Sequence, residues 1–415
     1  MRANYSINPA RPTLAFLVAG LLSGHALAAP TYAVVDTGQT ACYDNFREIA
    51  CPSPGQPFAG QDAQFSGIPF AYRDNGDGTV SDLSTGLMWV RDRGAKLSWD
   101  DAVAGAASNR TGGYGDWRMP TVKELYSLIN FTGKSGSSAA TSIPYLDTRY
   151  FGLAFGDASA GERLIDGQDW SATEYVGITM LQDAAVFGVN FIDGRIKGYP
   201  KSVRRMEGIS PNRMYVRYVR GNPAYGVNQF LDSGNNTVTD QASGLMWSKT
   251  DSGVAMNWEA ALAWVQTRNR EYYLGYNDWR LPNAKELQSV VDYTRAPGVT
   301  NSPALDPLFA STAIASEGGA IDYPFYWTGT THLDNGGAVY IAFGRALGYM
   351  RPRGDAAPRL LDVHGAGAQR SDPKNGQVAN YPLGRDATGN PIFGRGPQGD
   401  VIRIENFVRL VRNVF

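Results

Sequence analysis

Residues 115–125 read GDWRMPTVKEL, and residues 277–287 read NDWRLPNAKEL. Both segments contain Asp-Trp-Arg, a proline two residues after the arginine, and Lys-Glu-Leu. In each, a residue suited to cap a helix, Thr121 or Asn283, stands three positions before a glutamate, which is the spacing of a capping box. The repetition predicts two copies of one fold, each with a short helix after the Trp-Arg pair.

Other blocks also occur twice in the same order. They are TGLMW at 85–89 and SGLMW at 243–247, Trp99 and Trp258 at the start of helical patterns, WSAT at 170–173 and WTGT at 327–330, and YVRYVR at 215–220 and FVRLVR at 407–412. Alternation around Asn-Gly and Asp-Gly in residues 72–82 predicts a hairpin. Helices and strands segregate, so we expect a loop-rich α+β fold, with two helices and a mostly antiparallel sheet in each copy.

The segments around the repeats predict how the chain is organised. Arg2 and Arg11, an apolar run and the small residues at 26–28 form the pattern of a cleavable signal peptide. The apolar run is too short to span a bilayer, so we expect no membrane span and export to the periplasm or the cell exterior. The expected parts are a signal peptide at 1–28, an N-terminal leader at 29–64, a first repeat domain at 65–221, and a second repeat domain at 222–415 with an insert at 352–400.

Both cysteines, Cys42 and Cys51, lie in the leader. Because an exported protein meets an oxidising compartment, we expect them to form a disulfide. Without residues 1–28 the chain has 36 basic and 39 acidic residues. This balance predicts no general affinity for polyanions, and we expect no nucleic-acid partner.

The order of these blocks resembles the Legionella collagen-like protein C-terminal domain family. The blocks are TGLMW, a helix led by tryptophan, Asp-Trp-Arg with its proline, Lys-Glu-Leu, and late strands with Tyr-Val-Arg. Both copies match, and the leader segment at 42–65 resembles the start of exported tandem members. The helix followed by Trp-Arg-Leu-Pro is also similar to the wider C-type-lectin-like fold, so the resemblance implies two tandem C-type-lectin-like domains.

The resemblance also implies a function. The collagen-like namesake of the family is an adhesin that binds sulfated glycosaminoglycans, which implies a ligand-binding surface domain here. This chain has no Gly-X-Y repeat, so the trimerising stalk of the namesake is missing. The avidity that such a stalk provides is therefore not implied for this chain.

Known catalytic and metal motifs are absent from the sequence. It contains no HExxH metal motif and no G-x-S-x-G nucleophile elbow. The loop at 74–78, DNGDG, has the oxygen ligands of a calcium loop, but position twelve is Thr85 rather than glutamate, and a hairpin turn explains it equally well. We therefore expect no catalytic residue, no metal site and no cofactor, with calcium at this loop as the open alternative.

Basic residues gather late in each repeat. Residues 195–220 contain eight basic residues and one acid, and residues 345–415 contain eleven basic residues and six acids. The insert is a Gly/Pro-rich loop, and long loops of this kind are often functional. Arginine can bond two anionic oxygens at once, and lysine adds a point charge. The candidate ligand-binding residues are His364, Arg370, Asp372 and Lys374 in the insert, with Arg204 and Arg205 as lesser contributors.

These observations predict a non-enzymatic, exported, adhesin-like protein that recognises an anionic polysaccharide or another cell-envelope component. One alternative is a structural or assembly protein of the envelope whose insert binds a protein partner. An exposed apolar patch on the insert would favour that alternative. Another is a hydrolase that uses carboxylates, which needs two such groups about 5–10 Å apart in a cleft. A solvated strand face is the alternative interpretation of the basic stretches.

Overall fold

The computed structural model describes residues 1–2, 30–181, 183–205, 208–334, 336–352 and 354–414. Most of the expected signal peptide therefore lies outside the described residues. The described part is mostly sheet with few helices, in agreement with the expected mixed class. None of its helices is long and apolar enough to cross a bilayer.

The two repeats contain the same elements in the same order. In repeat one these are β3 (Tyr72–Asp74), β4 (Thr79–Asp82), β5 (Leu87–Val90), α1 (Trp99–Ser108), α2 (Val122–Ser127), β6 (Asp169–Glu174), β7 (Ala185–Asn190), β8 (Arg195–Pro200) and β11 (Val219–Gly221). In repeat two they are β12 (Phe230–Asp232), β13 (Thr237–Asp240), β14 (Leu245–Ser248), α3 (Trp258–Arg270), α4 (Ala284–Ser289), β17 (Phe325–His332), β18 (Gly337–Ala342), β21 (Gln369–Asp372) and β24 (Val411–Asn413).

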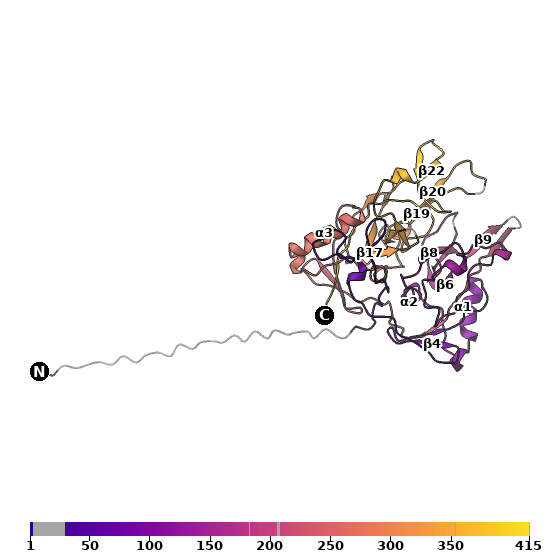
Figure 1. Cartoon of the computed structure of the whole chain (residues 1–415), viewed down its shortest axis with the longest axis horizontal. Helices are drawn as coiled ribbons and strands as arrows, with labels where there is room; N and C mark the ends of the chain where they lie inside the picture. The colour runs from indigo at the N-terminus through magenta and orange to yellow at the C-terminus, as the bar shows by residue number, and fades with distance from the viewer. Residues whose placement is uncertain (3–29, 182, 206–207, 335, 353, 415) are drawn as a thin grey trace.

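Shorter elements lie outside this common order. They are the pairs β1 (Cys42–Tyr43) and β2 (Glu48–Ile49), β9 (Ser202–Arg205) and β10 (Gly208–Pro211), β15 (Ile314–Ala315) and β16 (Ile321–Asp322), β19 (Leu347–Met350) and β20 (Arg359–Asp362), β22 (Pro382–Arg385) and β23 (Pro391–Phe393), and the helix α5 (Pro297–Thr300). In Figure 1, α3 and α1 lie at opposite sides of the molecule, and the β9 and β22 hairpins project from it.

Capping residues determine where the second helix of each repeat begins. Thr121 Oγ1 accepts a hydrogen bond from the Glu124 backbone N–H at 3.1 Å, and the Glu124 carboxylate accepts one from the Thr121 backbone N–H at 2.8 Å. Asn283 and Glu286 make the same pair of bonds at the start of α4. These bonds confirm both capping boxes. Each box satisfies backbone N–H groups that the first turn of its helix leaves without a partner.

A six-stranded sheet joins the two repeats. Each repeat also has its own four-stranded antiparallel sheet, in the order β11-β5-β4-β3 and β12-β13-β14-β24. The large sheet has the order β17-β18-β21-β8-β7-β6, with three strands from each repeat. At its centre β21 pairs with β8 through one register pair, Gln369 with Ile196. The repeats therefore share one sheet.

The two faces of this sheet carry different cores. Successive side chains of a strand point to opposite faces. Phe187 and Val189 of β7 and Val339 of β18 pack with α2 and α4 in a core shared by both repeats. On the opposite face, Val186 belongs to a core of repeat one and Tyr340 to a core of repeat two. The outward side chains of β8 and β21 lie between these two cores.

The repeats differ in the strand that occupies the sheet centre. Residues 194–199 read GRIKGY and residues 344–349 read GRALGY, directly after β7 and β18. The first segment forms β8 in the large sheet. The second leads into β19, which pairs with β20 outside that sheet, and β21 from the insert lies beside β18 instead. The insert therefore supplies the strand through which the repeats meet.

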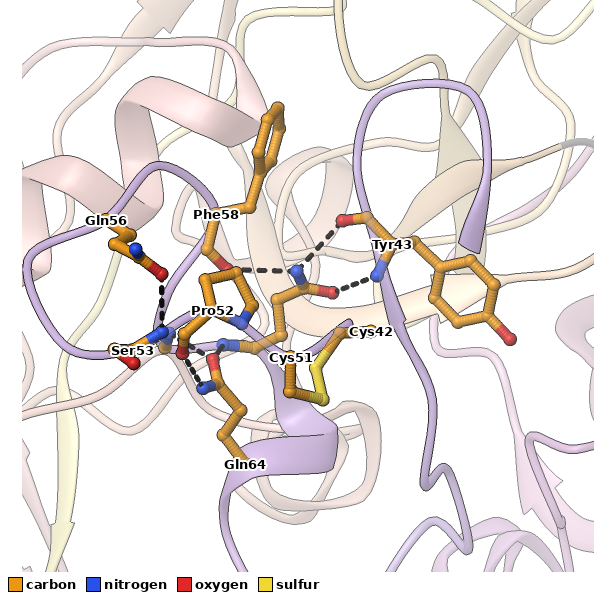
Figure 2. Close-up of a disulfide and its surroundings, with 10 residues drawn as sticks. Cys42, Tyr43, Cys51, Pro52, Ser53, Gln56, Phe58 and Gln64 are labelled. Atoms are coloured by element: carbon orange, nitrogen blue, oxygen red, sulfur yellow. Dashed lines mark hydrogen bonds between the residues drawn. A yellow bond between two sulfur atoms is a disulfide. The ribbon is translucent and has the colours of Figure 1, made fainter. Parts of the chain in front are cut away.

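The leader is closed by the predicted disulfide between Cys42 and Cys51, which is confirmed. Figure 2 shows this bond beside the β1–β2 hairpin. The Gln61 side chain donates to the carbonyl oxygens of Tyr43 and Phe58, both at 2.9 Å. The disulfide and Gln61 together hold the leader in a fixed shape.

Much of the leader lies against repeat two, although repeat one follows it directly in the chain. The side-chain amide of Gln39 exchanges two hydrogen bonds with the backbone of Thr331, each 2.8 Å long. Buried Asp62 accepts from the hydroxyls of Thr330 at 2.6 Å and Thr37 at 2.7 Å. The leader therefore binds to β17 of repeat two, which follows it by almost 300 residues.

Candidate functional site

The arginine of each Asp-Trp-Arg segment has a structural partner. Arg118 Nη1 donates to Glu124 Oε2 at 2.7 Å, and Arg280 Nη2 donates to Glu286 Oε1 at 2.6 Å. The carboxylate that caps the helix therefore also holds the arginine. Each arginine thus joins its loop to the helix cap, so these residues serve the fold.

A second pair of arginines, in the late strands, bonds backbone carbonyl groups. Arg217 donates to the carbonyl oxygens of Val90 at 2.8 Å and Gly152 at 2.6 Å. Arg409 donates to that of Ala310 at 2.7 Å and to two further carbonyls. Both side chains are buried. These arginines fix loops of their own repeat and are closed to a ligand.

Among the predicted ligand-binding residues, His364 is buried and lies behind Arg370. His364 Nε2 lies 2.8 Å from Asp400 Oδ1, and Arg370 bonds the other oxygen of that carboxylate. Burial lowers the pKa of His364 to about 4. Burial alone would raise the pKa of Asp400, but the charges of Arg370 and His364 hold it well below its usual range. His364 therefore supports the Arg370–Asp400 pair.

Lys374 and Asp372 make contacts inside the fold. Lys374 Nζ donates to the carbonyl oxygen of Asp44 at 2.9 Å and lies 4.1 Å from the ring centroid of Trp258. Burial lowers the pKa of Lys374 to about 7. Asp372 accepts from Asn406 Nδ2 at 3.1 Å, and burial raises its pKa. Lys374 thus ties the leader to α3 and is 2% exposed, which leaves little room for a ligand.

Arg204 and Arg205 lie on the projecting β9–β10 hairpin. Arg204 is exposed. Arg204 does not line the cavity that contains Arg370. The structure therefore brings Arg370 and Asp372 to one cavity, with His364 bonded to the same carboxylate as Arg370, and places Lys374 and Arg204 outside its lining.

That cavity, which we call the junction pocket, has a volume of about 220 Å³. Its walls come from β8, β21 and residues 395–401. Its charged lining residues come from both repeats, and bases outnumber acids. They are Arg163, Arg195, Lys197, Arg370 and Arg395, with Asp193, Asp372 and Asp400.

The four arginines of the junction pocket all have partners. These bonds fix the positions of the guanidinium groups and neutralise part of their charge. The pairs are Arg195 with Asp193 (Nη1–Oδ2 2.9 Å), Arg163 with Asp166 (Nη2–Oδ1 2.6 Å), Arg370 with Asp400, and Arg395 with the carbonyl oxygen of Ser371.

Lys197 is the exception among the basic residues of the junction pocket. It is only 9% exposed, and its ammonium makes no hydrogen bond and no ion pair with any described residue. Its described contact is with the Tyr199 ring, 5.0 Å from the centroid. Burial, and then the charge of nearby Arg370, lower the pKa of Lys197 to about 8. At neutral pH it is therefore a nearly buried cation that no acid bonds directly. The acids that act on it, Asp193 and Asp400, are already bonded by Arg195 and Arg370, which favours an anion beside the lysine.

Sequence reasoning counted Arg195 and Lys197 within a basic segment but selected neither. A usable signal was present, because Lys197 of GRIKGY stands where GRALGY has Leu347. Leu347 is buried, at 7% exposure. A lysine where the sister motif has a leucine singles this residue out in the sequence, and the structure places the two on different strands, β8 and β19. Arg395 follows the β22–β23 hairpin and carried no such signal.

The DNGDG loop forms the turn between β3 and β4, as the hairpin prediction required. Asp74 Oδ1 accepts from the Gly76 N–H and Asp77 Oδ1 from the Thr79 N–H, both at 3.0 Å. These carboxylates thus bond the backbone of their own turn. In the described part of the chain, no cluster of three or more His, Cys, Asp or Glu residues is placed to hold a metal ion.

The sequence matches the Lcl C-terminal domain family over residues 78–220 and again over residues 236–360. No curated protein and no solved structure matches the chain. The second match ends before β21, so Arg370 and Arg395 lie beyond it. The two ranges cover more than half of the 415 residues and contain one Asp-Trp-Arg segment each. The chain therefore belongs to the Lcl C-terminal domain family and carries two tandem copies of the domain.

Proposed function

We propose that this protein is a non-enzymatic, exported, adhesin-like binding protein. It holds an anionic group of a polysaccharide or another cell-envelope component in the junction pocket. We also propose a C-type-lectin-like fold for each repeat and a periplasmic or extracellular location. The family match and the leader disulfide support these assignments.

The observation that carries the proposal is the unpaired ammonium of Lys197. Removing a charge from water costs several kcal/mol unless a counter-charge pairs with it directly. Asp193 and Asp400 act on Lys197 without bonding it. A bound sulfate, phosphate or carboxylate group would supply the missing partner, and the fixed guanidinium of Arg370 would add hydrogen-bond donors.

The surface of the insert favours a glycan over a protein partner. Among its described residues, the large apolar side chain more than a third exposed is Leu383, at 36%. A protein interface of useful size needs a larger apolar patch than one side chain provides. The protein-partner alternative therefore has less support from this surface.

The test is a glycan array with the purified mature chain, read at low and high salt and with and without EDTA. We expect binding to sulfated or uronic glycans that weakens with salt and does not change with EDTA. Lys197→Leu should lower the affinity for the best of these glycans by about tenfold or more. Lys134→Leu is the matched control, since it removes the same charge from an exposed site outside the pocket.

A blank array with the wild-type chain would contradict the anionic-ligand proposal. Equal binding by the wild type and Lys197→Leu would contradict the site. Equal losses in Lys197→Leu and Lys134→Leu would show that net charge, and not the junction pocket, determines binding.

A further inference from the structure

The leader builds a second cavity, on repeat two, which shares no lining residue with the junction pocket. This leader groove has a volume of about 520 Å³, within the range of small-molecule sites. Leader residues 54–65 form one wall, and α3 with residues 277–280 forms the other. The leader, which follows the disulfide-closed loop at 42–51, therefore forms one side of the groove.

The lining of the leader groove is apolar and has an aromatic residue at its edge. Leu262, Val265 and Trp279 contribute apolar side chains that are almost wholly buried. Phe65 also lines it and is 40% exposed, so its ring is open to a ligand. A surface of this kind suits the C–H face of a ring-shaped ligand.

The charged residues of the leader groove are mostly neutralised. Arg280 is held by Glu286 in a buried pair. Asp278 is bonded by Arg412, with Nε–Oδ1 at 2.7 Å and Nη2–Oδ2 at 3.0 Å. The remaining charge, Arg270, is exposed. This balance favours an uncharged ligand, in contrast to the junction pocket.

Side-chain amides supply most of the other polar groups of the leader groove. Gln64 donates to the Pro52 carbonyl oxygen at 2.6 Å, a bond visible in Figure 2. The Asn269 amide exchanges two bonds with the backbone of Trp279, at 2.7 and 2.8 Å. Exposed Asn277 makes no side-chain hydrogen bond with any described residue. Amides both donate and accept, which matches the hydroxyl groups of a sugar.

Repeat one shows that the fold does not require this cover. Val103 of α1 corresponds to Leu262 of α3, counted from Trp99 and Trp258. Val103 is 43% exposed, whereas Leu262 is fully buried. The same helix position is thus left open in one repeat and enclosed beside the leader in the other. The leader therefore covers a helix position in repeat two that the shared fold leaves exposed in repeat one.

From these observations we propose that the leader groove is a binding site for an uncharged saccharide ring. The ring packs its C–H face on Phe65 and the apolar lining, and its hydroxyl groups bond the amides, with Asn277 available as a donor and acceptor. This site works separately from the proposed anion site, so the protein reads neutral and charged sugars at two places.

The test is saturation-transfer NMR and calorimetry on the full mature chain with uncharged oligosaccharides. The probes are maltohexaose, cellohexaose, mannohexaose and chitohexaose at millimolar concentration. We expect at least one to bind, and Phe65→Ala and Asn277→Ala each to weaken that binding by about tenfold. Phe46→Ala is the matched control, because Phe46 is a leader phenylalanine that is 82% exposed and does not line the groove.

The inference is overturned if none of the four probes binds, or if both groove variants bind as the wild type does. It is also overturned if Phe46→Ala weakens binding as much as Phe65→Ala. Lys197→Leu separates the two proposals, since it should weaken sulfated or uronic glycans and leave the neutral probe unchanged.

Discussion

The two repeats agree where the fold is held together and differ where the junction pocket lies. Arg217 and Arg409 occupy equivalent places and bond equivalent loop carbonyls. By contrast, Lys197 and Leu347 match in the motifs GRIKGY and GRALGY but differ in character and in place, since Lys197 lies on β8 in the large sheet and Leu347 on β19 outside it. Duplicated positions therefore mark the scaffold of the domain. Positions that diverge while remaining buried mark the part that has become specific to one repeat.

The same difference explains why the site lies at the junction. In repeat one the GRIKGY strand, β8, lies in the large sheet, and in repeat two an insert strand, β21, takes the corresponding place. Arg370 on β21 pairs in register with Tyr340 of β18. The neighbouring residue of β21, Gln369, pairs with Ile196 of β8, which follows Arg195. Neither repeat alone contains this set of charged residues, so the junction pocket forms only where the two repeats pack together.

The largest expected effect tests the shared scaffold. Arg217→Met and Arg409→Met should each lower the free energy of unfolding by about 4 kcal/mol, because buried carbonyl groups lose their donors. Urea unfolding should show a similar loss for both variants and a single transition, since the repeats share a core. A loss below about 1 kcal/mol in either variant would contradict the equivalence of the two arginines.

The next effect tests the leader, which contacts repeat two more than repeat one. Replacing Cys42 and Cys51 by serine should lower the free energy of unfolding by about 2–3 kcal/mol, through the entropy of the opened loop. Amide hydrogen exchange should rise in α3, beside the leader, and stay unchanged in α1. Equal increases in α1 and α3 would show that the leader stabilises the whole molecule evenly.

A swap between the repeats tests the diverged position. Lys197→Leu should raise the free energy of unfolding by about 1–2 kcal/mol in the absence of ligand, because an unpaired, nearly buried charge is removed. Leu347→Lys should lower it by at least as much. Thermal unfolding in low-salt buffer measures both. Destabilisation by Lys197→Leu would mean that the lysine has a structural partner, and the functional assignment would fail.

The smallest effect is the pH dependence of anion binding. Since the pKa of Lys197 is about 8, its charge is present at pH 7 and largely lost at pH 9. Affinity for a sulfated or uronic glycan should therefore fall between these values, by less than about tenfold. The charged groups around the lysine are Arg163, Asp193, Arg370 and Asp400. The part of the decline due to Lys197 should vanish in Lys197→Leu, and an identical decline in that variant would exclude the lysine as its source.

Much of the scaffold could be predicted from the sequence because its signals are local. The capping boxes, the hairpin at 72–82 and the disulfide each depend on residues within about ten positions. The strand β21 could not be predicted in this way. Its sequence, QRSD at 369–372, is polar and has no apolar alternation, and it becomes a strand because β8 and β18 lie on either side of it.

The candidate site was predicted only in part, for a related reason. The density of charged residues in the insert drew attention to Arg370, which does line the junction pocket. It could not show that Lys374 turns inward to the carbonyl of Asp44, because that partner lies 330 positions earlier. Long-range pairing decides which polar side chains face solvent, and a single sequence does not reveal it.

The position of the leader has a consequence for the timing of maturation. Asp44 is made early, and Lys374, which bonds its carbonyl oxygen, follows 330 residues later. At about 5–20 residues per second, roughly 15 to 65 s of synthesis separate the two partners. Contacts over such separations also form slowly after synthesis. The bond between the leader and the insert therefore cannot form until this interval has passed, and the two ends of the fold are joined last.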